Sequence, residues 1–259
     1  MKTQQQQKKL LVMDSFWHQL YDKSQRQSID KKPIAAVQLN HCLDRAASVD
    51  SAAAQWIASP AAGVVRILLE RDGGEKTTRA TSLVAYEPNS QFASHSHPKG
   101  EEFVVLAGTF SDENGDYPAG TYVRNPPGSS HSPFSRDGCL IFVKLQQFLE
   151  SDSQRVVDNI DIDFTSNKVK DEHWQTLFDD AEHGNDVVNV YQAKKETSLP
   201  SSLMEQGVEI LVLTGEISMA LKQYKVGHWL RLPPNTNEKI TVTANTLLWI
   251  KTNHLKGQS

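Results

Sequence analysis

Three histidines and a glutamate in the middle of the chain have the residue types and spacing of a metal site. His95 and His97 are two residues apart, so their side chains share one face if this segment is a β-strand. A turn over residues 98–100 then brings Glu101 to the start of the next strand, and His131 follows a later turn rich in proline and glycine. We therefore predict that these four side chains bind one metal ion.

The ligand types restrict the metal. Neutral imidazole nitrogens with one carboxylate suit zinc, iron, manganese, nickel or copper, and they leave coordination positions for water or a substrate. Calcium and magnesium prefer oxygen ligands and are disfavoured. We expect one divalent transition metal, with zinc as the first choice and iron, manganese or nickel as alternatives. If the protein is an enzyme, Glu101 is the residue that could act as a base.

The segments around these residues predict an all-β protein. After Pro33 the chain consists of short runs rich in β-branched and aromatic residues, separated by Gly, Pro, Asn and Asp, which is typical of a sandwich or barrel. Before them, apolar residues from Leu10 to Tyr21 recur at helical spacing and predict a short helix. The polar tract from Met1 to Lys9 is expected to be disordered.

The strand-rich part of the chain is an internal repeat, because residues at a constant offset match without insertions. The matching segments are Glu102–Gly108 with Glu209–Gly215, Pro126–Pro127 with Pro233–Pro234, and Ile141–Lys144 with Leu248–Lys251. We predict a polar tail and short helix in residues 1–30, a metal-binding barrel in 31–150 and a second barrel in 151–259.

The second copy lacks the metal ligands. The same offset places Ser202, Met204, Val208 and Glu238 at the four ligand positions. These side chains do not form a transition-metal site of the first copy's kind. We expect the second barrel to bind no metal there.

The spacing of these residues resembles the two sequence motifs of the cupin family, G-x5-H-x-H-x3,4-E-x6-G and G-x5-P-x-G-x2-H. The first motif is met, apart from its leading glycine, by His95, His97, Glu101 and Gly108, and the second by Gly120, Pro126, Gly128 and His131. The resemblance implies a double-stranded β-helix, the jelly-roll barrel of the cupins, in two tandem copies. It also implies that the four predicted ligands bind the metal.

Within the cupins, residues 111–131 are similar to the C-terminal cupin domain of the anti-sigma factor ChrR, and the similarity extends from about Val64 to Leu145. It implies a metal-carrying cupin that takes part in the response to oxidative stress. In that family a separate N-terminal zinc domain holds the sigma factor. The first 60 residues here lack the paired cysteines of such a domain, so sigma-factor binding is not expected.

Three functions are compatible with these residues. The first is a sensor or regulatory module whose metal responds to an oxidant or another small ligand. The alternative is a metal-dependent dioxygenase, or a related cupin enzyme, that acts on a small organic substrate. In the third, the metal only stabilises the barrel. The identity of the metal would help to separate them, since zinc cannot activate oxygen by electron transfer.

Composition excludes several other classes. The formal net charge is −4 without a basic cluster, so nucleic acid is not an expected partner. No apolar run is long enough for a membrane span and no signal peptide is recognisable, so we expect a cytoplasmic protein. Cys42 and Cys139 are expected to be reduced thiols. The expected partners are a small molecule and a second copy of the chain in a homodimer.

Overall fold

The computed structural model describes residues 15–25, 29, 35–161, 172–181 and 186–255. A helix covers residues 15–25, which confirms the predicted short helix near the N-terminus. The helix buries Trp17 and Leu20, and the Tyr21 hydroxyl donates a hydrogen bond to the Tyr86 carbonyl at 3.1 Å. The polar tail and the beginning of the predicted helix fall outside the described residues. In the described part of the chain, no helix has the length and apolar character to cross a membrane.

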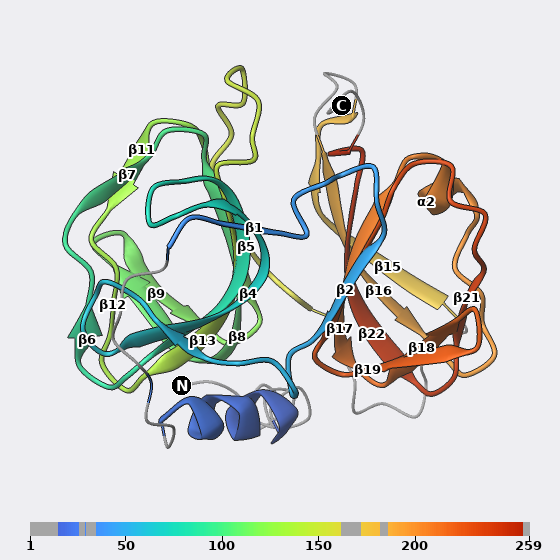
Figure 1. Ribbon diagram of the computed structural model, residues 1–259, viewed down its shortest axis with the longest axis horizontal. Helices are drawn as coiled ribbons and strands as arrows, with labels where there is room; N and C mark the ends of the chain where they lie inside the picture. The colour runs from blue at the N-terminus through green and yellow to red at the C-terminus, as the bar shows by residue number, and fades with distance from the viewer. Residues whose placement is uncertain (1–14, 26–28, 30–34, 162–171, 182–185, 256–259) are drawn as a thin grey trace. The chain divides into compact units, whose positions relative to one another are not determined.

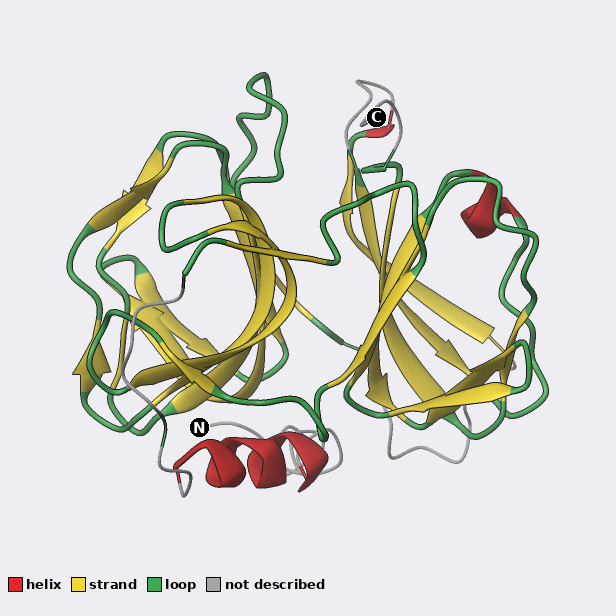
Figure 2. Ribbon diagram, viewed as in Figure 1, coloured by secondary structure: helices red, strands yellow, loops and turns green. Residues whose placement is uncertain are grey.

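The chain divides into two compact units that consist mainly of strands (Figures 1 and 2). The first barrel contains the described residues of 14–41 and 54–159, and the second barrel contains those of 42–53 and 160–259. The predicted all-β architecture with two barrels is therefore confirmed.

The first barrel has a large sheet in the order β1-β4-β5-β13-β8-β10-β14, onto which β3, β9, β6 and β12 pair, and a separate two-stranded sheet of β7 and β11. Its strands are β1 (Val37–Leu39), β3 (Ile57–Ala58), β4 (Val64–Gly73), β5 (Thr77–Tyr86), β6 (Ser90–Gln91), β7 (His95–His97), β8 (Glu101–Asp112), β9 (Gly115–Pro118), β10 (Thr121–Asn125), β11 (Ser129–His131), β12 (Phe134–Ser135), β13 (Cys139–Leu145) and β14 (Val156–Asn159).

The second barrel has a sheet in the order β15-β16-β22-β17-β20-β2 and a smaller one in the order β19-β18-β21. Its elements are β2 (Ala47–Asp50), β15 (Glu172–Asp179), β16 (Val187–Ala193), the short helix α2 (Ser202–Glu205), β17 (Val208–Thr214), β18 (Glu216–Met219), β19 (Lys222–Lys225), β20 (His228–Leu232), β21 (Ile240–Val242) and β22 (Thr246–Thr252).

The two barrels repeat one topology. Strands β8, β10 and β13 correspond to β17, β20 and β22, and they pair in the same order. Each copy also has one edge strand from outside this core, because β14 pairs with β10 and β2 pairs with β20. Strand β2 precedes the first barrel's main strands in the sequence but belongs to the second unit.

A pair of glycines marks the same irregularity in both copies. Gly108 and Gly215 have φ values of 70° and 76°, and the β8–β13 and β17–β22 ladders each change register beside them. A Cβ on Gly108 would lie 2.1 Å from the Gly138 carbonyl oxygen, so a side chain does not fit there. The register shift changes which residues of β8 point into the barrel. Phe103 and Val105 face the core before the shift and Phe110 faces it afterwards.

The copies differ where the first one carries the predicted ligands. The first barrel has the two-stranded sheet of β7 and β11 at this place, whereas helix α2 replaces β7 in the second barrel. Met204 and Val208 are buried in the apolar core of the second barrel, together with Ile210 and Leu232. Two of the four positions predicted to hold ligands in the first copy therefore contribute to packing in the second, whereas the other two, Ser202 and Glu238, are exposed.

Candidate metal centre

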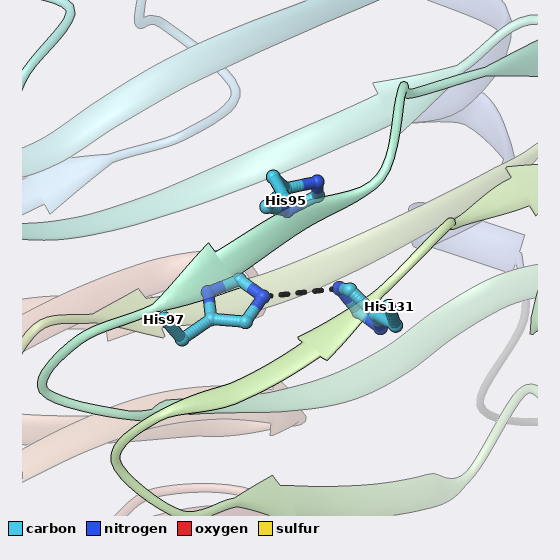
Figure 3. Close-up of side chains that lie close together, drawn as sticks. All are labelled: His95, His97 and His131. Atoms are coloured by element: carbon cyan, nitrogen blue, oxygen red, sulfur yellow. Dashed lines mark hydrogen bonds between the residues drawn. The ribbon is translucent and has the colours of Figure 1, made fainter.

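The histidines come together because β7 and β11 form an antiparallel pair. His95 lies directly opposite His131 in this pair, and His97 lies two residues from His95 on the same face. Nitrogen atoms of the three rings lie within 4.8 Å of one another, and Figure 3 shows His97 and His131 facing each other. Among the described residues, these histidines form the only cluster of metal-ligating type whose donor atoms are this close.

Each ring has a defined orientation. The Nδ1 atom of His95 lies 3.0 Å from the Ala93 carbonyl oxygen, and since a carbonyl can only accept, this nitrogen carries the hydrogen and leaves Nε2 with a free lone pair. The Nε2 atoms of His97 and His131 are 3.1 Å apart (Figure 3). Both of these rings are buried. Donor nitrogens of the three rings thus lie close enough together to bind one ion once their lone pairs are free.

Glu101 lies beside this point, at the beginning of β8. Its Oε2 atom is 3.6 Å from Nε2 of His97 and 3.5 Å from Nε2 of His131. The Asn125 amide donates a hydrogen bond to the same oxygen at 3.1 Å. The carboxylate is buried. All four residues predicted from the sequence therefore lie in one place, and Asn125 is a neighbour that the motif spacing did not single out.

Asp112 holds His131 from the side away from Glu101. Its Oδ2 atom lies 3.2 Å from Nδ1 of His131, while its Oδ1 atom accepts hydrogen bonds from the Asn114 amide and the Tyr117 hydroxyl at 2.8 and 3.1 Å. A hydrogen bond at Nδ1 fixes the tautomer in which Nε2 is free to bind a metal. Sequence reasoning missed Asp112.

The two buried imidazoles have opposite pKa shifts. Burial lowers the pKa of His97, although the charge of Glu101 opposes this. Burial also disfavours the charged form of His131, but its hydrogen bond to Asp112 and the charges of Glu101 and Asp112 outweigh that effect and raise its pKa. The carboxyl pKa of Asp112 is lowered, because its hydrogen bonds with His131, Asn114 and Tyr117 outweigh burial. Asp112 is therefore an ionised partner for His131.

Replacing Asp112 with asparagine is expected to weaken metal binding by about 10- to 100-fold, the usual effect of losing a hydrogen-bond partner of a ligating histidine. The amide oxygen would stay with Asn114 and Tyr117, so the amide NH2 group would face Nδ1 of His131 and favour the tautomer with hydrogen on Nε2. Competition titration with a chromophoric chelator measures the affinity. Asp116→Asn, an exposed change on the same hairpin, should bind metal like the wild type.

A cavity of about 690 Å³ borders the cluster. His95, His97, Glu101 and His131 all line it. Much of the remaining wall is apolar and comes from strands β5 and β13, with Val84, Tyr86, Ile141 and Val143. A cavity of this size accommodates a small organic molecule. The four residues are thus accessible to a ligand from within the barrel.

Comparison with known proteins agrees with this architecture. The family model described as the ChrR cupin-like domain matches residues 44–149. No curated protein matches the sequence. A solved cupin 2 conserved barrel domain protein from Leptotrichia buccalis is 15% identical, and the similarity covers 87% of this chain and 99% of that one with a TM-score of 0.52.

Two further solved structures have the same fold. A putative dioxygenase from Nostoc punctiforme is 11% identical, with 86% of this chain and 87% of that one covered and a TM-score of 0.59. The bacterial pirin YhhW from Escherichia coli, in complex with nickel(II), is 12% identical, with 80% and 98% covered and a TM-score of 0.60. Residues 44–149 therefore match the ChrR cupin-like domain, and the chain has the fold of the solved cupin protein, with the barrel occurring twice.

Proposed function

We propose that the first barrel binds one divalent transition metal through His95, His97, Glu101 and His131, and that the protein is a sensor or regulatory module responding to an oxidant or another small ligand at this site. The observation that carries the proposal is the convergence of three imidazoles and a carboxylate at the wall of a cavity. A metal that only stabilised the barrel would not require a ligand-sized cavity beside it.

The distances among His97, His131 and Glu101 fit a metal of this class. Two ligand atoms that are each about 2.1 Å from the same ion lie about 3–3.4 Å apart. The Nε2 atoms of His97 and His131 are 3.1 Å apart, and Glu101 Oε2 is within 3.6 Å of both. Zinc is our first choice and iron, manganese or nickel are alternatives. When bound, such an ion supplies an open coordination position for a small ligand.

The chain's own residues prepare this position. When His131 is neutral, Asp112 holds its hydrogen on Nδ1 and leaves the lone pair on Nε2, and the Ala93 carbonyl does the same for His95. Asn125 fixes the near oxygen of Glu101 and thereby the orientation of the carboxylate. Burial lowers the pKa of His97 and favours its neutral form, which is the form that binds a metal.

A second candidate is a metal-dependent dioxygenase or a related cupin enzyme. The placement of Glu101 favours it, because this carboxylate lines the cavity and would lie against a bound organic molecule. A general base must be within hydrogen-bonding reach of the proton that it removes. In this case Glu101 would exchange a proton with the substrate, while the apolar walls exclude water.

Amide hydrogen exchange and oxygen uptake together separate the sensor from the enzyme. Protein loaded with iron(II) or with zinc is treated with hydrogen peroxide, and amide hydrogen exchange is followed in β7 and β11. In the iron(II) form, a sensor is expected to show a change in exchange that reaches its limit at about half an equivalent of peroxide per site, because peroxide accepts two electrons and each iron gives one, without continuing oxygen consumption; the zinc form, which has no redox chemistry, is the control. Continuing oxygen uptake by the iron form with an organic substrate would favour the enzyme. Unchanged exchange with peroxide and with small ligands would contradict the sensor.

A further inference from the structure

The cavity beside the metal centre has a charged wall in addition to its apolar one. The charged wall consists of Arg66, Arg71, Glu75 and Lys76, from β4 and the turn that follows it. None of these residues belongs to the cupin motifs. Their chemistry indicates what kind of molecule the cavity holds.

A β-bulge directs Arg71 into the barrel. In the β4–β5 ladder Leu68 pairs with Ser82, but Glu70 pairs with Thr81, so one residue of β4 is extra at this point. Arg71 consequently lies opposite Ala80, on the face of β5 that Ser82 also occupies. Without the bulge, Arg71 would point to the opposite face. The register shift thus places a guanidinium in the cavity wall.

The Arg71 guanidinium is buried without a full set of partners. Arg71 is only 2% exposed. Its Nη2 atom donates a hydrogen bond to the Gly74 carbonyl. Its Nε atom has no hydrogen-bond partner among the described residues. Burial and the nearby charge of Arg66 lower the pKa of Arg71, although the charge of Glu75 opposes them. A buried donor without a partner is costly, so an acceptor supplied by a ligand would stabilise it.

Arg66 differs from Arg71 because it already has a carboxylate partner. Its Nη2 atom lies 2.7 Å from both carboxylate oxygens of Glu75. The three basic side chains and two carboxylates that line the cavity leave an excess of one positive charge when the histidines are neutral. In the metal-free protein this balance matches a ligand with one negative charge.

We propose that the cavity binds a small monocarboxylate with an apolar body, whose carboxylate accepts hydrogen bonds from Arg71. The apolar body would lie against Val84, Tyr86 and Ile141, which bring it to the histidine cluster. The proposal rests on the proposed function in that it names the class of ligand for the same cavity. Phosphate esters fit the metal-free cavity less well, because their second negative charge would lie near Glu75 and Glu101.

Binding of matched probes tests this proposal. The probes are hexanoate and 3-phenylpropanoate, with hexanol and 3-phenylpropanol as their neutral counterparts, and affinities are measured by titration calorimetry on metal-free and metal-loaded protein. We expect each carboxylate to bind the wild type about 10- to 100-fold more tightly than its alcohol, as for a charge-assisted hydrogen bond. Arg71→Leu should remove this preference and leave the affinity for the alcohols unchanged.

Two further variants complete the test. Arg71→Lys keeps the positive charge but lacks the planar guanidinium, so it should retain part of the preference for carboxylates over alcohols. Arg136→Leu changes an exposed arginine outside the cavity and should retain the whole preference. Equal binding of acids and alcohols by the wild type would overturn the proposal. So would a carboxylate preference that requires the metal and is unaffected by Arg71→Leu. An Arg71-dependent preference in metal-free protein would support it even if the metal proposal failed.

Discussion

A variant in which His95 and His97 are both alanine is expected to retain almost no metal, whereas the wild type should bind about one ion per chain. The two imidazoles supply half of the predicted ligand set, and the remaining His131 and Glu101 cannot complete the coordination of a transition metal in a buried site. Elemental analysis of both proteins after reconstitution and desalting measures the difference.

The matched control for this variant lies in the second barrel. His173 and His228 are outside the metal cluster, and neither position corresponds to a predicted ligand in the first barrel. A His173→Ala, His228→Ala protein should bind as much metal as the wild type. If both double variants lost the same amount of metal, binding would depend on surface histidines in general and our assignment would be wrong.

Replacing Arg124 with alanine should lower the free energy of unfolding by about 3–5 kcal/mol, the usual cost of removing one partner from a buried ion pair. Arg124 is 0% exposed, forms an ion pair with Asp152, and lies 3.6 Å from Glu102. Its guanidinium carbon is 3.7 Å from the centre of the Phe148 ring. The variant would leave two buried carboxylates without this charge. Urea unfolding followed by circular dichroism gives the change.

An exposed arginine provides the comparison. Arg136 pairs with Asp116 at 3.0 Å, but both side chains are more than half exposed, at 64% and 57%. Exposed pairs contribute little to stability, so Arg136→Ala should unfold at the same urea concentration as the wild type. Equal destabilisation by Arg124→Ala and Arg136→Ala would show that the buried pair has no special role in the first barrel.

The sequence was sufficient to predict the barrels and to predict that His95, His97 and His131 come together beside Glu101. The alternation of side chains along a strand places His95 and His97 on one face, and the position of His131 after a turn allows it to return to the same place. The absence of the ligand residues from the second copy could also be predicted from the sequence, because Met204 and Val208 are apolar; both pack into the core of the second barrel. These features depend on local spacing and on residue type.

Residues that depend on register shifts could not be predicted in the same way. If side chains alternated regularly between the two faces of β8 from Glu101 onward, Asp112 would point away from the barrel interior. The register shift beside Gly108 exchanges the two faces, so Asp112 points inward and contacts His131. The bulge in β4 has the same effect on Arg71. A bulge adds one residue without an apolar pattern that would reveal it.

Long-range pairing of edge strands was a further limit. Strand β2 has the short sequence Ala-Ser-Val-Asp, which contains neither a strong hydrophobic alternation nor a turn signal linking it to β20. Its partner lies far along the chain, so only tertiary structure reveals the pairing. The pairing of β14 with β10 could not be predicted either, because β14 is a four-residue strand with only two valines and no alternation of apolar and polar residues.

The most direct test of the proposed metal centre is a crystal of the protein reconstituted with zinc or nickel, with diffraction recorded at the absorption edge of that metal. We predict one strong anomalous peak in the first barrel, with nitrogen ligands from His95, His97 and His131 about 2.1 Å away and a carboxylate oxygen of Glu101 at a similar distance. A fully reconstituted crystal without a peak there, or with the ion bound elsewhere, would contradict the proposal.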